Sequence, residues 1–192
     1  MRGEFAVIGR AARLALAILF VASSSGAASI EGVEFDERVT AGDRVLALRS
    51  LGLLRYRIFF KGYVAALYLE PGTPAKDALE DIPKRLELEY FWPIPAEKFG
   101  RVAESALEKN LDAQSFERLR PRVEALHDEY QDVEPRDRYA LTYVPDQGTE
   151  LSKNGVRLAL VPGEDFARDY FGIWLSETPL DRKLRDQLLN GG

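Results

Sequence analysis

The sequence has 192 residues, 46% of them hydrophobic and 30% charged, with a formal net charge of −5 and no cysteine. This length suits a single domain with a sizeable core. The acidic balance and the lack of a basic cluster argue against nucleic acid or anionic lipid as a partner. The absence of cysteine excludes disulfides, thiol nucleophiles and cysteine zinc sites.

The first 28 residues have the pattern of a secretory signal peptide. Three arginines precede an apolar run, Leu14–Ala22, and Ser23–Ala28 supplies small residues for cleavage. The run is shorter than the roughly 20 residues of a membrane-spanning helix, and an uncleaved anchor is the alternative. We therefore predict export, most simply into a bacterial periplasm, with membrane contact only through this segment and a mature domain at 29–192.

Leu51–Glu70 is the most strand-like run of the sequence, rich in aromatic and branched residues, with Gly62 in its middle. Glycine inside a strand often marks a bulge. Read as one strand, the run points Arg55 and Tyr68 to opposite faces, and one extra residue at Gly62 would bring them onto the same face. A guanidinium and a phenol on one apolar face suit an anionic or carbonyl head group with an apolar tail. The alternative is structural, with Arg55 along a sheet edge and Tyr68 in the core.

The rest of the chain supplies further strands and a set of helices. Alternating residues and turn signals predict strands at Ile30–Phe35, Arg44–Leu48, Leu86–Phe91, Arg138–Val144, Thr149–Ser152 and Val156–Val161. Helical spacing predicts helices at Ala96–Asn110, over 116–130, at Gly163–Leu175 and after the capping box Thr178–Asp181. Pro121 suggests that the second helix is two pieces or begins near that residue. The order of these elements predicts an α+β fold with an antiparallel sheet.

The sequence has none of the common catalytic or nucleotide-binding motifs, such as G-x-S-x-G, a P-loop or G-x-G-x-x-G. Its one histidine, His127, lies off the apolar stripe beside Asp128 and Glu129 and has no partner at catalytic or metal-ligand spacing, so we interpret it as solvated. No metal and no cofactor are expected. The residues favour a binding domain, or an enzyme that relies on Arg, Tyr and hydrogen bonds alone.

Several motifs, in order along the mature chain, resemble those of the chalcone isomerase-like family, more narrowly its exported bacterial members. They are G-L-L-R at Gly52–Arg55, F-F-K-G-Y-V-A-A-L-Y-L at Phe59–Leu69, Y-x-P-x-x-G-T at Tyr143–Thr149, N-G at Asn154–Gly155, P-G-x-D-F-A at Pro162–Ala167 and I-W-L-S-x-x-P-x-D-x-x-L at Ile173–Leu184. The resemblance implies an open antiparallel sheet, helices packed across one face, and a ligand cleft between them.

The resemblance to plant chalcone isomerases places their cleft arginine at Arg55 and their cleft threonine at Tyr63. Their catalytic tyrosine, which follows a P-I-P-like turn, falls at Phe99. Their asparagine falls near Ala103 or Ala106, and their C-terminal polar pair near Asp169–Tyr170. Loss of the phenol at Phe99 removes an acid–base group typically worth about 10²–10⁴ in rate, which argues against chalcone isomerase activity.

The non-catalytic branch of the family, the plastid fatty-acid-binding proteins, is a closer resemblance. There an arginine and a tyrosine hold a carboxylate, and an acyl chain fills the cleft. The resemblance therefore implies an exported protein without catalytic residues that binds a small apolar acid, such as a fatty acid. Arg55 would pair with the anion, Tyr68 or Tyr63 would donate a hydrogen bond, and the cleft wall would include Phe59, Phe99, Phe166, Tyr170 and Trp174.

Two alternatives stay open. The first is an isomerase or intramolecular lyase acting on an enone-like substrate, with Arg55 as the electrophile and Tyr63 as the acid. The second is a protein-interaction module of the cell envelope with a filled cleft.

Overall fold

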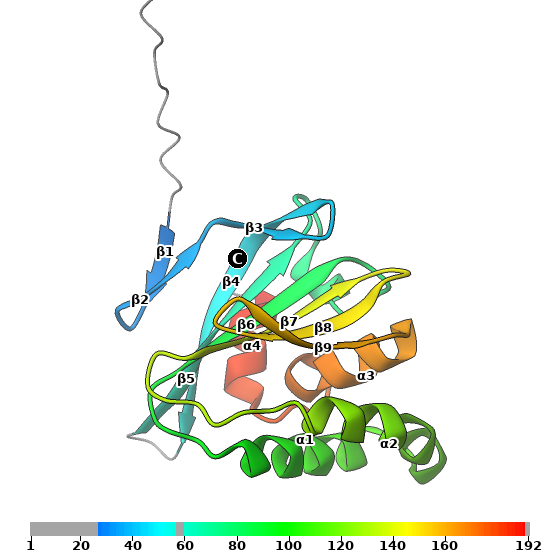
Figure 1. Cartoon of the computed structure of the whole chain (residues 1–192). Helices are drawn as coiled ribbons and strands as arrows, with labels where there is room; N and C mark the ends of the chain where they lie inside the picture. The colour runs from blue at the N-terminus through cyan, green and yellow to red at the C-terminus, as the bar shows by residue number, and fades with distance from the viewer. Residues whose placement is uncertain (1–26, 57–59, 191–192) are drawn as a thin grey trace, which may run out of the picture.

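The computed structural model describes residues 27–56 and 60–190, and its main element is a seven-stranded antiparallel sheet (Figure 1). The strands follow chain order across the sheet, from β3 (Arg38–Ala41) through β4 (Arg44–Tyr56), β5 (Phe60–Leu69), β6 (Lys84–Tyr90), β7 (Arg138–Val144) and β8 (Gly148–Lys153) to β9 (Val156–Val161). The hairpin of β1 (Ala27–Ile30) and β2 (Val33–Asp36) is a separate two-stranded sheet.

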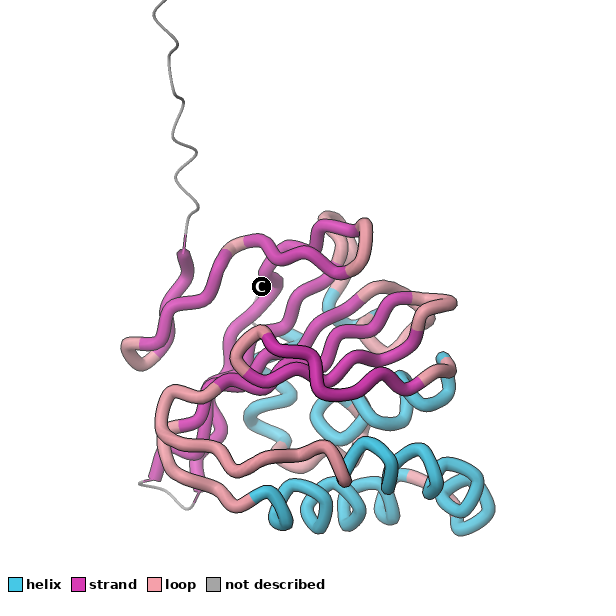
Figure 2. Tube along the Cα trace, in the orientation of Figure 1, coloured by secondary structure: helices cyan, strands magenta, loops and turns pink. Residues whose placement is uncertain are grey.

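The helices pack on one face of the large sheet (Figure 2). They are α1 (Ala96–Asn110), α2 (Ala113–His127), α3 (Glu164–Leu175) and α4 (Arg182–Asn190), and a short 3-10 helix, η1 (Ala75–Asp77), follows β5. α3 is the most buried of them: Phe166, Tyr170 and Phe171 have no solvent exposure. The α+β class and the arrangement of helices across one face of an antiparallel sheet are confirmed.

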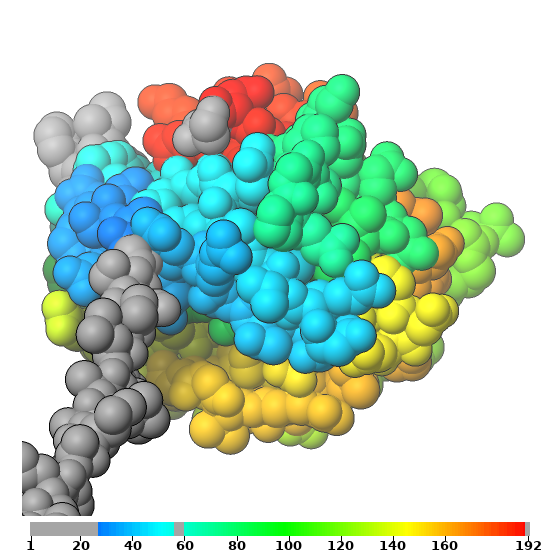
Figure 3. All heavy atoms as spheres, turned by 90° about the horizontal axis from the view of Figure 1, so that it is seen from above, coloured from blue at the N-terminus to red at the C-terminus, as the bar shows by residue number. Residues whose placement is uncertain are grey.

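Each face of the sheet has its own hydrophobic core. The helix side contains Leu67 and Leu86 among many others, packed against α1 to α4. The opposite side contains Phe35, Leu46 and Tyr68, and the hairpin β1–β2 and strand β3 cover it. Figure 3 views the molecule from that side, and the blue and cyan residues of β1 to β4 occupy much of it.

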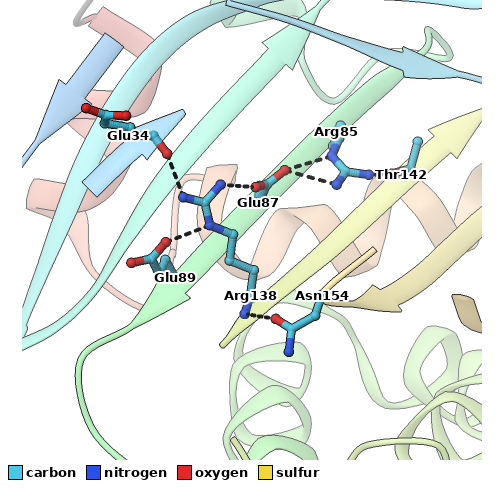
Figure 4. Close-up of polar contacts among 7 residues, drawn as sticks. All are labelled: Glu34, Arg85, Glu87, Glu89, Arg138, Thr142 and Asn154. Carbon is cyan, nitrogen blue, oxygen red and sulfur yellow. Dashed lines mark hydrogen bonds and ion pairs between the residues drawn. The ribbon is translucent and has the colours of Figure 1, made fainter. Parts of the chain in front are cut away.

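Arg138 links β2 to the face of the sheet opposite the helices (Figure 4). Its guanidinium donates to Glu87 at 2.9 Å, to Glu89 at 2.6 Å and to the backbone carbonyl of Glu34 at 2.5 Å. The same group lies 4.6 Å from the centre of the Phe35 ring. Because both nearly buried carboxylates are paired, the network is satisfied within the protein, as buried charges require. We assign it to holding the β1–β2 hairpin in place.

The run Leu51–Glu70 is not one strand but the end of β4 and the whole of β5. The two strands are joined by residues 57–59, which lie outside the described part. A bulge is present at Gly62, as predicted, because Leu54 pairs with Tyr63 while Arg55 pairs with Lys61. A Cβ at Gly62 would come within 2.7 Å of the Leu54 side chain, so glycine allows the two strands to approach closely here.

Three other elements differ from the prediction. The segment 30–35 is a hairpin, because Glu31 and Gly32 both adopt positive φ angles, of 54° and 79°, in a tight turn between β1 and β2. Pro121 does not divide α2: it lies on the exposed side while Phe116 and its neighbours on the buried face hold one continuous helix. α4 begins after Asp181, whose carboxylate accepts from the Leu184 amide at 2.7 Å, so Asp181 and not Thr178 is its cap.

The predicted signal peptide lies outside the described residues except for its last two. Ala27 and Ala28 belong to β1, where they pair with Asp36 and Phe35. In the described part of the chain, the helices fall short of the length and apolarity needed to cross a bilayer.

We expect Gly148→Ala to destabilise the fold strongly. Gly148, at the start of β8, has a φ of 109°, and an added Cβ would lie 2.5 Å from the backbone oxygen of Val161. Backbone strain and overpacking together should lower the free energy of unfolding by about 3 kcal/mol or more, as measured by urea unfolding. Gly155→Ala is the matched control, since its φ is 80° but no atom lies within 4 Å of the added Cβ. Equal losses of unfolding free energy in the two variants would contradict the role of the close contact with the Val161 oxygen.

Candidate ligand-binding site

A cavity of about 800 Å³ lies between the helix side of the sheet and helices α1 and α3. This volume is within the range of roughly 300–1,000 Å³ for small-molecule sites. Its inner walls are apolar side chains of β6, β7, β8, α1 and α3, namely Leu86, Leu88, Leu141, Leu151, Ala103 and Ile173. Such walls suit a hydrocarbon chain, because each contact removes apolar surface from water.

The mouth of the cavity opens at the hairpin end of β4 and β5, beside the first turn of α1. Exposed side chains surround it, including Arg55, Phe60, Lys61, Trp92 and Lys98. The Trp92 indole N–H donates to the Lys61 carbonyl at 2.8 Å, and its ring meets that of Phe60 edge-on. The mouth therefore combines cations with aromatic rings, while the interior is apolar.

Glu31 bridges the two cations at the mouth. Its carboxylate accepts from Arg55 Nη2 at 3.0 Å and from Lys61 Nζ at 2.6 Å. The hydrogen bond from Lys61, followed by the charges of both cations, lowers the pKa of Glu31 and keeps it ionised. The positive φ of Glu31 in the β1–β2 turn aims it at this pair. A ligand carboxylate at the mouth would compete with Glu31 for the same two cations.

Two phenols lie one step inward from the mouth. Tyr63 follows the Gly62 bulge, and its oxygen accepts from the Trp174 indole N–H at 2.9 Å. Tyr90 pairs with Tyr63 across β5 and β6, and the two rings lie 5.5 Å apart. Burial raises the pKa of both phenols, so they stay neutral at ordinary pH. Among the described residues neither hydroxyl donates to a protein acceptor, so both are free to donate to a ligand oxygen.

His127 is not solvated, contrary to the prediction. Its side chain is 10% exposed, because this face of α2 packs against α1 and α3. Its Nε2 lies 3.2 Å from the Tyr170 hydroxyl, which in turn lies 3.0 Å from the Tyr130 hydroxyl on the cavity wall. Its Nδ1 lies 3.7 Å from Glu104. These groups form a polar chain from the helix surface to the cavity wall.

We expect His127→Gln to make stability less sensitive to mild acid. Burial lowers the pKa of His127 below its ordinary value of 6.5 in the folded protein. Between the two pKa values the unfolded state binds more protons, so the folded state loses stability as the pH falls below 6.5. Glutamine keeps a polar partner for Tyr170 without this titration. Unfolding free energies measured from about pH 7 to about pH 5 should fall less in His127→Gln than in the wild type, and parallel curves would contradict this role.

Three of the four predicted ligand-binding residues line the cavity: Arg55, Tyr63 and Phe99. Tyr68 does not, because it belongs to the core on the opposite face of the sheet. The bulge does place Tyr68 on the same face as Arg55, but Arg55 lines the mouth because it lies near the end of β4. Tyr68 is seven residues, or about 23 Å along β5, from Lys61, the strand partner of Arg55. The two side chains therefore cannot hold one head group, and Tyr68 has the core role given as the alternative.

The predicted cleft wall is correct for some aromatic residues. Phe99, Tyr170 and Trp174 line the cavity, and Phe99 stacks on Tyr130 at 5.1 Å. Phe166 is buried behind Tyr170 and does not line it. Phe59 lies outside the described residues.

Sequence reasoning missed Glu31, Tyr90 and Trp92. Tyr90 shares a face with Leu86 and Leu88 in the alternating strand 86–90, so the pattern predicts that it lies on the core side of the sheet. The pattern does not show whether a residue on that side lines a cavity or packs in the solid core. Glu31 comes from the separate β1–β2 hairpin, and no spacing in the sequence connects it with Arg55.

The site offers hydrogen-bond donors and cations. Neutral phenols polarise or bind an oxygen atom but do not abstract protons near neutral pH. Asp181 at the mouth is engaged by the Leu184 amide as the α4 cap. Residues 27–56 and 60–190 contain no group of three or more His, Asp or Glu side chains placed to hold a metal ion.

The comparisons with known proteins agree with this architecture. A family model described as chalcone isomerase-like matches residues 27–190. Among solved structures, a fatty-acid-binding protein of Arabidopsis thaliana is similar over 86% of this chain and 97% of its own, with a TM-score of 0.66 and 16% identity. At that identity the likeness concerns the fold. No sequence among the curated proteins matches this chain.

Proposed function

This chain belongs to the chalcone isomerase-like family, and from that premise we propose that it binds a small apolar acid, such as a fatty acid, without catalysing a reaction on it. The observation that carries the proposal is the cavity of about 800 Å³, apolar inside and bordered at its mouth by Arg55 and Lys61. An amphiphile with one anionic end matches that distribution of charge. The similarity of the fold to a fatty-acid-binding protein supports the same ligand class.

The ligand carboxylate lies at the mouth in this proposal. Arg55 and Lys61 attract it in place of Glu31, and the free hydroxyls of Tyr63 and Tyr90 donate to its oxygens. The acyl chain extends inward past Phe99. Phe99 has no hydroxyl, which agrees with a binding role and not with acid–base chemistry at this position.

Titration calorimetry with hexadecanoate tests the head-group roles. Tyr63→Phe removes one hydrogen bond and should weaken binding by about 1 kcal/mol, or roughly fivefold. Tyr68→Phe is its matched control, since it makes the same change on the same strand but on the opposite face. Arg55→Ala should weaken binding by up to about 1 kcal/mol because the side chain is half exposed. Arg44→Ala is the control on β4 for the lost charge.

Extraction of the purified protein tests the ligand class directly. Native mass spectrometry followed by denaturing extraction should recover a fatty acid. A protein that carries no lipid, together with equal hexadecanoate affinity in Arg55→Ala and Arg44→Ala, would refute the proposal. Turnover of a chalcone-type enone that depends on Arg55 would replace it with the isomerase.

We also propose export to the periplasm through residues 1–28. N-terminal sequencing of the protein from fractionated cells should give a chain that begins near residue 29, in the periplasmic fraction. Intact Met1 in the cytosolic fraction would refute export without affecting the ligand proposal.

A further inference from the structure

Exposed apolar side chains are concentrated at the mouth of the cavity. Seven large hydrophobic residues in the described part are at least 40% exposed, and four of them line this cavity, whereas Val45, Val156 and Leu160 lie elsewhere. The four are Phe60 at 53%, Trp92 at 54%, Val102 at 45% and Leu180 at 40%. Apolar side chains gathered in this way mark a surface that contacts another apolar phase.

Cations border the same surface along α1. Lys98, Arg101 and Lys109 recur at helical spacing with Val102, so they lie on the flank of α1 toward Leu180. Arg101, Val102, Lys109 and Leu180 also line a groove of about 270 Å³ that adjoins the mouth. Glu104 points the other way, toward His127 of α2, whereas Glu97 pairs with Arg101 at 2.8 Å and offsets one of the three charges.

We propose that this docking rim, formed by Phe60, Trp92, Val102 and Leu180 with Lys98, Arg101 and Lys109, binds the surface of an anionic lipid bilayer. Aromatic rings beside lysine and arginine suit the boundary between headgroups and acyl chains. Glu31 offsets one of the charges of Arg55 and Lys61, so α1 supplies most of the attraction. The chain as a whole carries a net charge of −5, so only a local cationic surface can face an anionic membrane favourably.

Docking at this surface would place the cavity mouth against the bilayer. An apolar acid could then move between membrane and cavity without its acyl chain crossing water, which would otherwise cost about 0.8 kcal/mol for each exposed methylene. The inference goes beyond the proposed function, because docking can be measured with no acid present.

The two tryptophans allow a local test. Trp92 is on the docking rim and Trp174 is buried in the cavity, so Trp174→Phe leaves a single reporter at the rim. Vesicles of phosphatidylcholine and phosphatidylglycerol should shift Trp92 emission to the blue and shield it from iodide. Vesicles of phosphatidylcholine alone should have a much smaller effect. Because the signal is local to the rim, attachment of another segment of the chain to the vesicle would not produce it.

A matched pair of double variants tests the charges. Arg101→Gln with Lys109→Gln, two residues that line the adjoining groove and not the ligand cavity, should weaken anionic-vesicle binding about 25-fold, or about fivefold for each cation. Lys76→Gln with Arg157→Gln makes the same charge change in η1 and β9, away from the docking rim, and should have little effect. Hexadecanoate affinity without vesicles should be unchanged in both, which separates loss of docking from loss of the ligand site.

Either of two results would overturn membrane docking. One is an unchanged Trp92 spectrum in the presence of anionic vesicles, and the other is equal weakening in the two double variants. A Trp92 shift produced by a protein fraction but not by lipid would assign the docking rim to a protein partner instead.

Discussion

Ala103→Trp is expected to reduce hexadecanoate affinity about 100-fold or more while the protein stays folded. Ala103 lies on α1, is 6% exposed and faces the cavity, so the new indole enters open space. It would displace ligand atoms equivalent to about four methylenes, at about 0.8 kcal/mol each. Filling a cavity adds contacts, so the unfolding free energy should be equal to or above that of the wild type. Calorimetric titration and urea unfolding measure the two quantities.

The control for this substitution is Ala125→Trp, on the exposed side of α2. It adds the same side chain to a helix without entering the cavity, and its ligand affinity should equal that of the wild type. If Ala103→Trp were folded and bound hexadecanoate normally, the ligand could not lie in this cavity, whatever else the protein binds.

The second large effect is the dependence of affinity on chain length. Dodecanoate should bind roughly 200-fold more tightly than octanoate, because four further methylenes enter apolar walls at about 0.8 kcal/mol each. The gain should end once the cavity of about 800 Å³ is full. A series of saturated acids, titrated below their micelle concentrations, measures it.

A dicarboxylic acid of the same length provides the matched ligand. Its second carboxylate would have to enter walls formed by Leu86, Leu141 and Leu151, and among the described residues no cation lines this inner part of the cavity. Burying such a charge without a partner costs several kcal/mol, so dodecanedioate should bind much more weakly than dodecanoate. Equal affinities would mean that only the head group is held and the chain stays in water.

Local signals in the sequence were enough to find most of the secondary structure. The apolar spacing behind Pro95 gave the bounds of α1 correctly, and Asn154–Gly155 marked the β8–β9 hairpin. The glycine at position 62 indicated the bulge. These features depend on residues that are close to one another in the sequence, so they can be predicted from it directly. The family motifs extended this to the whole fold and to Arg55 as a residue of the mouth.

Where the same signals failed, a distant element decided the outcome. Leu51–Glu70 has the composition of one strand, but it folds into two paired strands. Pro121 is a helix breaker by propensity, yet the buried face of α2 overrides it. His127 lies beside two acidic residues in the sequence and beside Tyr170 in the structure.

The candidate site, like the fold, was only partly predictable from the sequence. The sequence by itself determined that an arginine and a tyrosine of one strand-forming run, Leu51–Glu70, would belong to an antiparallel sheet. Only the tertiary structure decided that Tyr63 and Tyr90 line the cavity while Tyr68 does not, and that Glu31 pairs with Arg55 and Lys61. The reason is physical: alternation along a strand fixes which residues share a face, but which face borders a cavity depends on how α1 and α3 pack over it.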